Sequence, residues 1–240
     1  MMYYFEKILE YLVNYLHLRN AIKPLYHKFY MDRKDKKQQE VIQKNGVRVL
    51  QEFHDCLTRS DIFYTLAFGT LLGAVREHGF IKHDLDIDTF VWKDQNSLNV
   101  RRVLHDAGFS LCYTFDVDEG NLALEETYEK DGVHIDIFYV YPPVDKLPYC
   151  CDFLAMEFSS YRVCMKKYGY VQARRLELPF KKSRRLADFE AIQLFIPENA
   201  EELLEFRYGK DYMVPNPKWG IQSHNEHIVV WTDKKGRYIE

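Results

Sequence analysis

The chain has 240 residues, of which 47% are hydrophobic, and its formal net charge at pH 7 is −3. This length and composition fit one large domain, or one domain with a small annex, and supply enough apolar material for a substantial core. The slightly acidic balance excludes a global basic field, so no nucleic-acid partner is expected. Five cysteines without a CxxC pair argue against a zinc site and favour free thiols in the reducing cytoplasm.

Residues 1–37 are predicted to form an N-terminal helical extension. Ile8, Leu12 and Leu16 recur every four residues, as on an amphipathic helix, and the charged segment 31–37 predicts a solvated link. Charges interrupt the apolar run, which argues against a signal peptide or a membrane span. Packing on the domain, packing on a second subunit of a homo-oligomer and a peripheral membrane contact stay open for this helix.

Residues 38–240 are predicted to form one α/β domain. The Asp131-Gly132 pair between two strand-like runs indicates a β-hairpin. The predicted elements are a helix at 38–59 with an apolar stripe, a strand at 62–67, a helix at 70–77 ending near Gly79, a strand at 84–92, a helix at 97–107 ending at Gly108, and strands at 109–115, 125–130 and 133–141.

Beyond Pro148 the pattern turns helical and basic. Its clearest element is a helix with Asn199 as N-cap, Glu202 three residues later and Gly209 as the stop. Tyr208 and a nearby tyrosine, Tyr212, are expected to pack this helix onto the domain. The Pro- and aromatic-rich tail is expected to wrap back over the domain.

The segment GTLLGAVREHGFIKHDLDID at 69–88 is the most informative part of the chain. Asp84, Asp86 and Asp88 occupy alternate positions, so on a strand their carboxylates share one face. Like charges so close require cations between them, and hard oxygen ligands favour Mg²⁺ or Mn²⁺. The Gly69-Thr70 turn upstream offers backbone N–H groups to phosphate oxygens. Together these features predict phosphoryl or nucleotidyl chemistry.

A further acid, Asp136, stands within the apolar run VHIDIFYV at 133–140. A buried acid is costly unless it is paired or bound to a metal. One interpretation is a partner for a core Arg or Lys. The other is a third carboxylate that faces Asp86 and Asp88 from a neighbouring strand.

A Gly-Thr turn, an acid-x-acid strand and a third acid on a later strand are typical of the nucleotidyltransferase fold. More narrowly, the segment at 69–88 resembles the signature of the LicD family, usually GTLLGAVRHxGFIPWDDDID, and RYGKDYMVP at 207–215 is similar to that family's YGxDWxxP ending. Lys82-His83 replaces the usual Pro-Trp, and Leu85 replaces the middle acid. The resemblance implies an α/β (α+β) fold: a nucleotidyltransferase-like mixed β-sheet flanked by helices, with N-terminal helices and a C-terminal helical segment.

The resemblance also implies an activity: metal-dependent transfer of a phospho-alcohol, such as phosphocholine or ribitol phosphate, from a CDP-alcohol donor. The acceptor is implied to be a sugar hydroxyl of a cell-surface glycan or of its lipid-linked precursor, as in lipopolysaccharide or capsule biosynthesis. Asp86 and Asp88 would hold two Mg²⁺ (or Mn²⁺) ions. Asp136 would complete the second metal site and accept the proton of the acceptor hydroxyl.

Four further residues have implied roles at the donor. Asp84 would orient the metal ligands, and Gly69 and Thr70 would contact the donor phosphate. Arg76 would approach the same phosphates, with an ordinary ion pair as the alternative. The basic stretch at 181–185 is either a solvated face or a further contact to the donor diphosphate.

Two rival functions stay open. The same carboxylates would serve a nucleotidyltransferase that uses an NTP and releases pyrophosphate. A catalytically silent domain that binds a glycan or nucleotide is the second rival, and the altered KHDLD segment keeps it open. The expected location is cytoplasmic, with membrane association left open.

Overall fold

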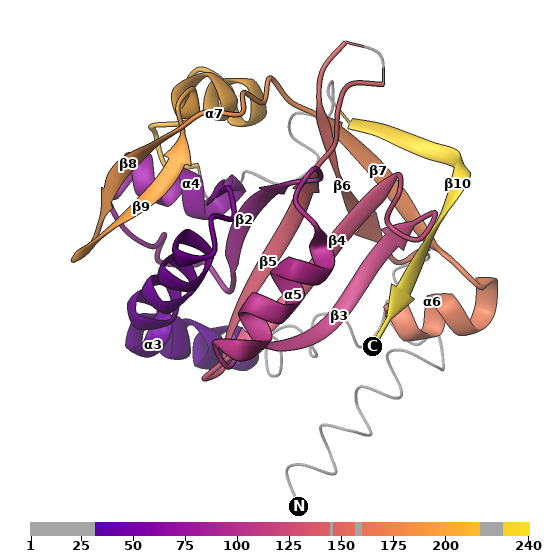
Figure 1. The fold of residues 1–240 in the computed structure, drawn as a ribbon, viewed down its shortest axis with the longest axis horizontal. Helices are drawn as coiled ribbons and strands as arrows, with labels where there is room; N and C mark the ends of the chain where they lie inside the picture. The colour runs from indigo at the N-terminus through magenta and orange to yellow at the C-terminus, as the bar shows by residue number, and fades with distance from the viewer. Residues whose placement is uncertain (1–31, 145, 157–159, 217–227) are drawn as a thin grey trace, which may run out of the picture.

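The computed structural model describes residues 32–144, 146–156, 160–216 and 228–240. Within these ranges the chain forms a curled mixed sheet with helices around it and a separate β-hairpin at one side (Figure 1). This arrangement confirms the predicted α+β class. The amphipathic helix predicted around Ile8, Leu12 and Leu16 lies outside the described residues, and the domain division at residue 37 stays a prediction.

The elements follow one another as α3 (Asp32–Arg59), β1 (Tyr64–Leu66), α4 (Phe68–Arg76), β2 (Ile87–Trp92), α5 (Ser97–Asp106), β3 (Ser110–Val117), β4 (Ala123–Lys130), β5 (Val133–Val140), β6 (Tyr149–Leu154), α6 (Tyr161–Tyr168), β7 (Val171–Glu177), β8 (Arg184–Phe189), β9 (Ile192–Pro197), α7 (Ala200–Tyr208) and β10 (Ile228–Ile239). The strand order of the larger sheet is β1-β2-β5-β4-β3-β10-β7-β6. In the described residues β2 and β5 run parallel, and the other paired strands run antiparallel.

Helix α3 packs its apolar stripe on the core, since Leu50, Phe53 and Leu57 are fully buried. This confirms the predicted stripe. The solvated link expected at 31–37 is wrong for residues 32–37, which form the first turns of α3. Lysine and arginine are good helix formers whose side chains can stay exposed, so a charged run does not by itself end a helix.

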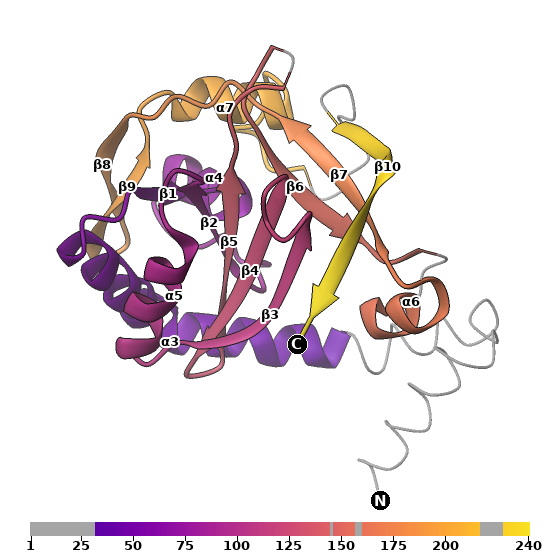
Figure 2. The same ribbon diagram turned by 45° about the vertical axis from the view of Figure 1, so that its right-hand side comes forward.

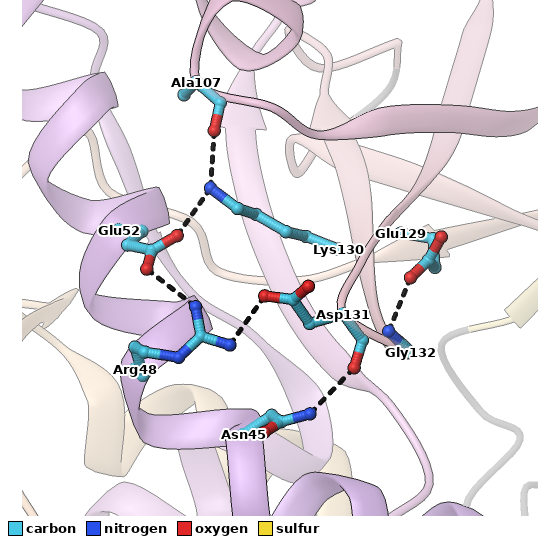
Figure 3. A network of polar contacts seen from close by, with 8 residues as sticks. All are labelled: Asn45, Arg48, Glu52, Ala107, Glu129, Lys130, Asp131 and Gly132. Atoms are coloured by element: carbon cyan, nitrogen blue, oxygen red, sulfur yellow. Dashed lines mark hydrogen bonds and ion pairs between the residues drawn. The ribbon is translucent and has the colours of Figure 1, made fainter.

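A polar network fastens α3 to the turn between β4 and β5 (Figure 3). Arg48 donates to Asp131 at 2.6 Å and to Glu52 at 2.8 Å. Lys130 pairs with the other oxygen of Glu52 at 2.5 Å and donates to a backbone carbonyl at the end of α5. Figure 2 shows α3 beneath this end of the sheet. The network therefore anchors the hairpin that carries one wall of the site.

The hairpin turn confirms the prediction from Asp131-Gly132. Both residues have positive φ angles, 52° and 81°, as a two-residue type I′ turn requires. This turn fixes the register of the β4–β5 ladder, so that Thr127 lies opposite Asp136 and Glu125 lies opposite Phe138.

The acidic segment differs from the prediction. The strand expected from Asp84 begins at Ile87, so that Asp84 and Asp86 belong to the preceding loop. Ile87 pairs with Ile135 of β5 at the first position of that ladder, and β1 reaches no further than Thr89. The chain leaves the sheet before Ile87, although β5 itself begins two residues before Ile135, at Val133. The Asp84 N–H instead donates to Ile81 O at 3.0 Å, in a turn.

The prediction that the region beyond Pro148 is helical is wrong in large part. Strands β6, β7 and β10 extend the sheet, and β8 pairs with β9. Arg174 and Arg175 of β7 are buried and form ion pairs with Asp152 and Glu177, respectively. Because basic residues are usually exposed, the sequence did not indicate a buried strand here. The tail does return to the domain, as β10 between β3 and β7.

The predicted helix after Asn199 is confirmed as α7, with Gly209 at its C-cap. The predicted side-chain cap is wrong. The Asn199 amide donates to Pro179 O at 2.8 Å and to Glu202 at 2.9 Å rather than capping the first turn.

All five cysteines are free, and Cys150 and Cys151 are buried, as expected. Among the described helices, none combines the length and the apolar character that a membrane crossing needs.

Two glycines of α4 yield opposite predictions. A Cβ at Gly73 would lie 2.4 Å from the backbone oxygen of Gly79, whereas a Cβ at Gly69 would lie 3.5 Å from its nearest neighbour, the Asp88 carboxylate. We expect Gly73→Ala to lower the free energy of unfolding by about 1–3 kcal/mol, as overpacking does. Gly69→Ala should leave it unchanged or slightly raised, since alanine favours helix. Urea denaturation of both variants measures this, and equal effects would contradict the close packing at Gly73.

Candidate active site

A groove of about 370 Å³ lies between the start of α4, the strands β2, β4 and β5, and the strands β6 and β7. Its lining includes Gly69, Asp86, Asp88 and Asp136. A larger surface groove of about 540 Å³ lies between α5, β3 and β10 and contains none of the predicted site residues. The site is therefore assigned by its chemistry and not by its size.

Asp88 and Asp136 are neighbours in the parallel β2–β5 ladder. The Gly69 N–H, in the first turn of α4, donates to Asp88 Oδ2 at 3.2 Å. The Thr127 hydroxyl donates to Asp136 Oδ1. These contacts orient both carboxylates, and the register confirms the prediction that Asp136 faces the acidic segment from a neighbouring strand.

Asp84 and Asp86 reach the same region from the loop before β2. The two carboxylate oxygens of Asp84 lie 3.6 and 3.8 Å from the point that a Cβ on Gly69 would occupy, where Asp88 Oδ2 also lies at 3.5 Å. Asp84 Oδ2 is buried without a hydrogen-bond partner. The predicted acids thus gather around Gly69, although a loop rather than strand alternation brings two of them there.

Burial of these acids makes their ionised forms costly. It raises the pKa of Asp136 to about 7, with a further contribution from the charge of Asp86. It likewise raises the pKa of Asp84 to about 7. Burial, followed by the charges of Asp86 and Asp136, raises the pKa of Asp88 well above its usual range. The groove therefore favours bound protons or bound cations.

Two acids of the groove were not predicted from the sequence. Glu125 of β4 is 8% exposed, and its Oε2 is buried without a hydrogen-bond partner. Burial, followed by the charges of Asp136 and Asp152, raises its pKa well above the usual range. Asp152 of β6 is held by Arg174, whose Nε donates to Asp152 Oδ1 at 2.8 Å.

The sequence contained a signal for Glu125. A two-residue turn at Asp131-Gly132 sets Thr127 opposite Asp136, and Glu125 then lies two residues along on the same face. For Asp152 no such signal exists, because β6 follows β5 in the chain but pairs with β7, at the other edge of the sheet.

Two residues predicted to contact donor phosphate make contacts within the protein. Thr70 is 1% exposed, and its hydroxyl oxygen accepts from the Asp88 N–H at 2.9 Å. Arg76 forms an ion pair with Glu77 at 2.8 Å and donates to Tyr212 O at 3.2 Å. The structure thus matches the ion-pair alternative for Arg76, and a phosphate contact by either residue stays a prediction.

The basic stretch at 181–185 lies outside the groove lining. Each of its cationic side chains has a protein partner: Lys181 pairs with Glu202, Lys182 with Asp94 and Arg185 with Glu201, while Arg184 donates to Tyr64 O and stacks on Phe195. Lys181 and Lys182 are exposed and match the solvated-face interpretation, whereas Arg184 is partly buried. Tyr208 of α7, in contrast, borders the groove.

The donor set fits a hard divalent cation. Its ligating atoms are carboxylate oxygens, and the buried Asp84 Oδ2 has no other partner. In the described part of the chain no three His, Cys, Asp or Glu side chains already stand in an ion-binding arrangement. Binding would therefore draw Asp86, Asp88 and Asp136 together, and the Mg²⁺ or Mn²⁺ site stays a prediction.

Comparisons with known proteins agree on one family. A family model described as LicD/FKTN/FKRP, nucleotidyltransferase domain, matches residues 61–199, which is more than half of the chain. Ribitol-5-phosphate transferase FKTN of Homo sapiens is 24% identical over 176 residues, covering 73% of this chain and 35% of the relative. Its Mus musculus counterpart is 25% identical over 188 residues, covering 78% and 37%.

A bacterial relative matches a shorter segment. Lipopolysaccharide cholinephosphotransferase LicD of Haemophilus influenzae is 43% identical over 49 residues, which is 20% of this chain and 18% of the relative. The chain thus spans about a third of the length of the fukutin relatives. The family match ends at residue 199, so the similarity drawn for 207–215 stays a prediction.

The raised carboxyl pKa values predict a pH dependence of metal-free stability. Asp136 keeps its proton in the folded protein up to about pH 7, whereas the unfolded chain loses it near pH 4. Because the folded state then binds more protons, stability falls as the pH rises between those values. In chelator, the drop in Tm from pH 5 to pH 7.5 should be smaller in Asp136→Asn than in wild type, by on the order of 2–4 °C.

The exposed-site variant Asp106→Asn serves as the control for this comparison, since Asp106 is 70% exposed on α5. It should show the wild-type drop. Equal drops in all three proteins would contradict a buried, protonated Asp136.

Proposed function

The chain belongs to the LicD/FKTN/FKRP nucleotidyltransferase-domain family, and on that premise we propose that it is a metal-dependent transferase of phospho-alcohol groups. The donor is a CDP-linked alcohol, and the acceptor is a sugar hydroxyl of a cell-surface glycan or of its precursor. The observation that carries this proposal is the pairing of Asp88 with Asp136 beside Gly69 in one groove.

The names of the relatives support the class of reaction. One relative is named a ribitol-5-phosphate transferase and another a cholinephosphotransferase acting on lipopolysaccharide. Both names describe movement of a phosphate that carries an alcohol. The free, buried thiols of Cys150 and Cys151 support a reducing, cytoplasmic location. A peripheral membrane contact and a homo-oligomer stay open.

Each carboxylate has its own role in the proposed reaction. Asp86, Asp88 and Asp136 would hold Mg²⁺, which when bound neutralises the donor diphosphate and polarises the phosphorus centre. The Gly69 N–H fixes Asp88, and the Thr127 hydroxyl fixes Asp136, so that both present oxygens in defined directions. Asp84 orients the ligands from the loop before β2. The start of α4 lines the same groove, so the positive end of its helix dipole would also favour the donor diphosphate.

The bond changes balance as a single displacement. The acceptor oxygen forms a bond to the phosphorus that bears the alcohol, and the bond from that phosphorus to CMP breaks. Asp136 takes the proton of the acceptor hydroxyl. CMP leaves with the electron pair of the broken bond.

Asp88→Asn tests the role of the paired acids. The amide oxygen can still accept from the Gly69 N–H, so the fold should persist, while one ligating charge is lost. We expect the Mg²⁺-dependent rate of transfer from a CDP-alcohol to fall about 100-fold or more, since several kcal/mol of charge stabilisation disappears. Asp106→Asn is the matched control and should keep the wild-type rate. Wild-type turnover by Asp88→Asn would remove the basis of the assignment.

The products distinguish this proposal from its enzymatic rival. Incubation with Mg²⁺ and CDP-choline, CDP-ribitol or CDP-glycerol should release CMP, detected by chromatography, in the presence of a sugar acceptor. Incubation with NTPs should release no pyrophosphate. Pyrophosphate from an NTP without CMP from any CDP-alcohol would establish the nucleotidyl-transfer rival instead. Binding without either product would favour the catalytically silent domain.

A further inference from the structure

The groove extends beyond the proposed metal-binding acids toward β6 and β7. Its lining there combines Glu125, Asp152 and Arg174 with the rings of Phe138, Phe153 and Tyr161. Strand β6 packs across β4 and β5, which closes the curl of the sheet over this part of the groove. The proposed metal site uses none of these six residues.

Glu125 is the unsatisfied group in this part of the groove. It is 8% exposed, and its Oε2 is buried without a hydrogen-bond partner. Asp152 and Arg174 satisfy each other, because the guanidinium donates to both carboxylate oxygens. A buried acceptor without a donor costs free energy in the folded protein. Such a group at the wall of a groove indicates that a ligand supplies the missing donor.

The strand register sets the distance from the metal-binding acids. Glu125 follows the face of β4 that carries Thr127, the residue opposite Asp136. Residues two positions apart on a strand are separated by roughly 7 Å. A small organic group attached to a phosphate at Asp88 and Asp136 can therefore reach Glu125, whereas the phosphate itself cannot occupy both places.

Aromatic rings give this part of the groove a defined shape. Phe153 stacks on Phe115 with ring centroids 5.1 Å apart, and Tyr161 packs edge-on against Phe115 at 4.6 Å. The Tyr161 hydroxyl donates to Phe153 O at 3.0 Å, so it is already engaged. The rings supply fixed apolar faces for the C–H bonds of a polyol, beside the Glu125 carboxyl group, whose Oε2 can accept from its hydroxyls.

We propose that Glu125 is a substrate-binding residue whose Oε2 accepts a hydrogen bond from a hydroxyl of a polyol or sugar, packed against the Phe153 and Tyr161 rings. The inference rests on the proposed function, because it takes the phosphate to lie at Asp88 and Asp136. The alcohol being transferred and the acceptor sugar share this hydroxyl chemistry. Donor calorimetry tests the transferred alcohol, and the acceptor KM tests the acceptor sugar.

The first arm measures donor binding to the full chain by calorimetry in Mg²⁺, with CDP-ribitol and with CDP, which lacks the alcohol. Glu125→Leu removes the acceptor, and Glu125→Gln keeps an acceptor oxygen. Glu129→Gln is the matched control, because Glu129 lies at the far end of β4, outside the groove lining. We expect Glu125→Leu to weaken CDP-ribitol about 10- to 100-fold while leaving CDP unchanged, because the ligand hydroxyl would be buried without its acceptor.

Glu125→Gln should restore most of the affinity, and Glu129→Gln should match wild type.

The second arm measures the KM for methyl hexosides as acceptors, with CDP-choline as the donor, whose transferred group has no free hydroxyl. A raised acceptor KM in Glu125→Leu, with donor affinity unchanged, would support the inference and assign the subsite to the acceptor. The melting temperature of Glu125→Leu should not fall, since the variant removes an unsatisfied buried group.

Unchanged values in both arms would overturn the subsite. Equal weakening of CDP and CDP-ribitol would also overturn it, because Glu125 would then act on the metal site or the fold. The proposed function fails separately, if wild type neither binds a CDP-alcohol nor releases CMP. Wild-type turnover combined with insensitivity of Glu125→Leu would leave the proposed function standing and remove the subsite alone.

Discussion

The parallel register of β2 and β5 places Asp88 beside Asp136, and the rest of the site is arranged around the charge that this register concentrates. Two carboxylates on adjacent strands repel each other, and burial strengthens the repulsion. Bound protons or bound cations must offset this repulsion. The raised pKa values of both acids mean that, without a metal, protons can do so. A divalent cation can also offset the repulsion. Once bound, it would attract the phosphate groups of a ligand.

Helix α4 connects this pair of acids to the loop before β2. Its first turn supplies the Gly69 N–H to Asp88, and Thr70 accepts from the Asp88 backbone N–H. Its last turn packs Gly73 against Gly79 so closely that no side chain fits between them. The motif glycines thus serve two different purposes. One leaves space beside the carboxylates, and the other sets the path of the chain that returns Asp84 to them.

Local signals predicted the elements that local chemistry determines. The Asp131-Gly132 turn, the stop of α5 at Gly108 and the stop of α7 at Gly209 all follow from residues with positive φ. That Asp136 faces Asp88 from a neighbouring strand was one of two interpretations of a buried acid, and the resemblance to the nucleotidyltransferase pattern favoured it. Glu125 was within reach of the same reasoning, because the hairpin register places it on the face of Asp136.

The elements that distant partners determine could not be predicted in this way. The start of β2 depends on where its pairing with β1 and β5 begins, so the strand appeared longer in the sequence than it is. Strand β7 was hidden because Arg174 is buried by pairing with Asp152, a residue of another strand. Asp152 joins the groove through the curl of the sheet, which no short sequence pattern encodes.

A divalent cation shared by Asp86, Asp88 and Asp136 near the donor phosphates is the central feature of the proposed site. The most direct test is a crystal structure of the full chain with Mn²⁺ and CDP, in which anomalous scattering locates the metal. We expect an anomalous peak bonded to oxygens of Asp88 and Asp136 and in contact with the diphosphate. A diphosphate bound elsewhere, or a peak held by other side chains while Asp88 and Asp136 stay apart, would contradict it.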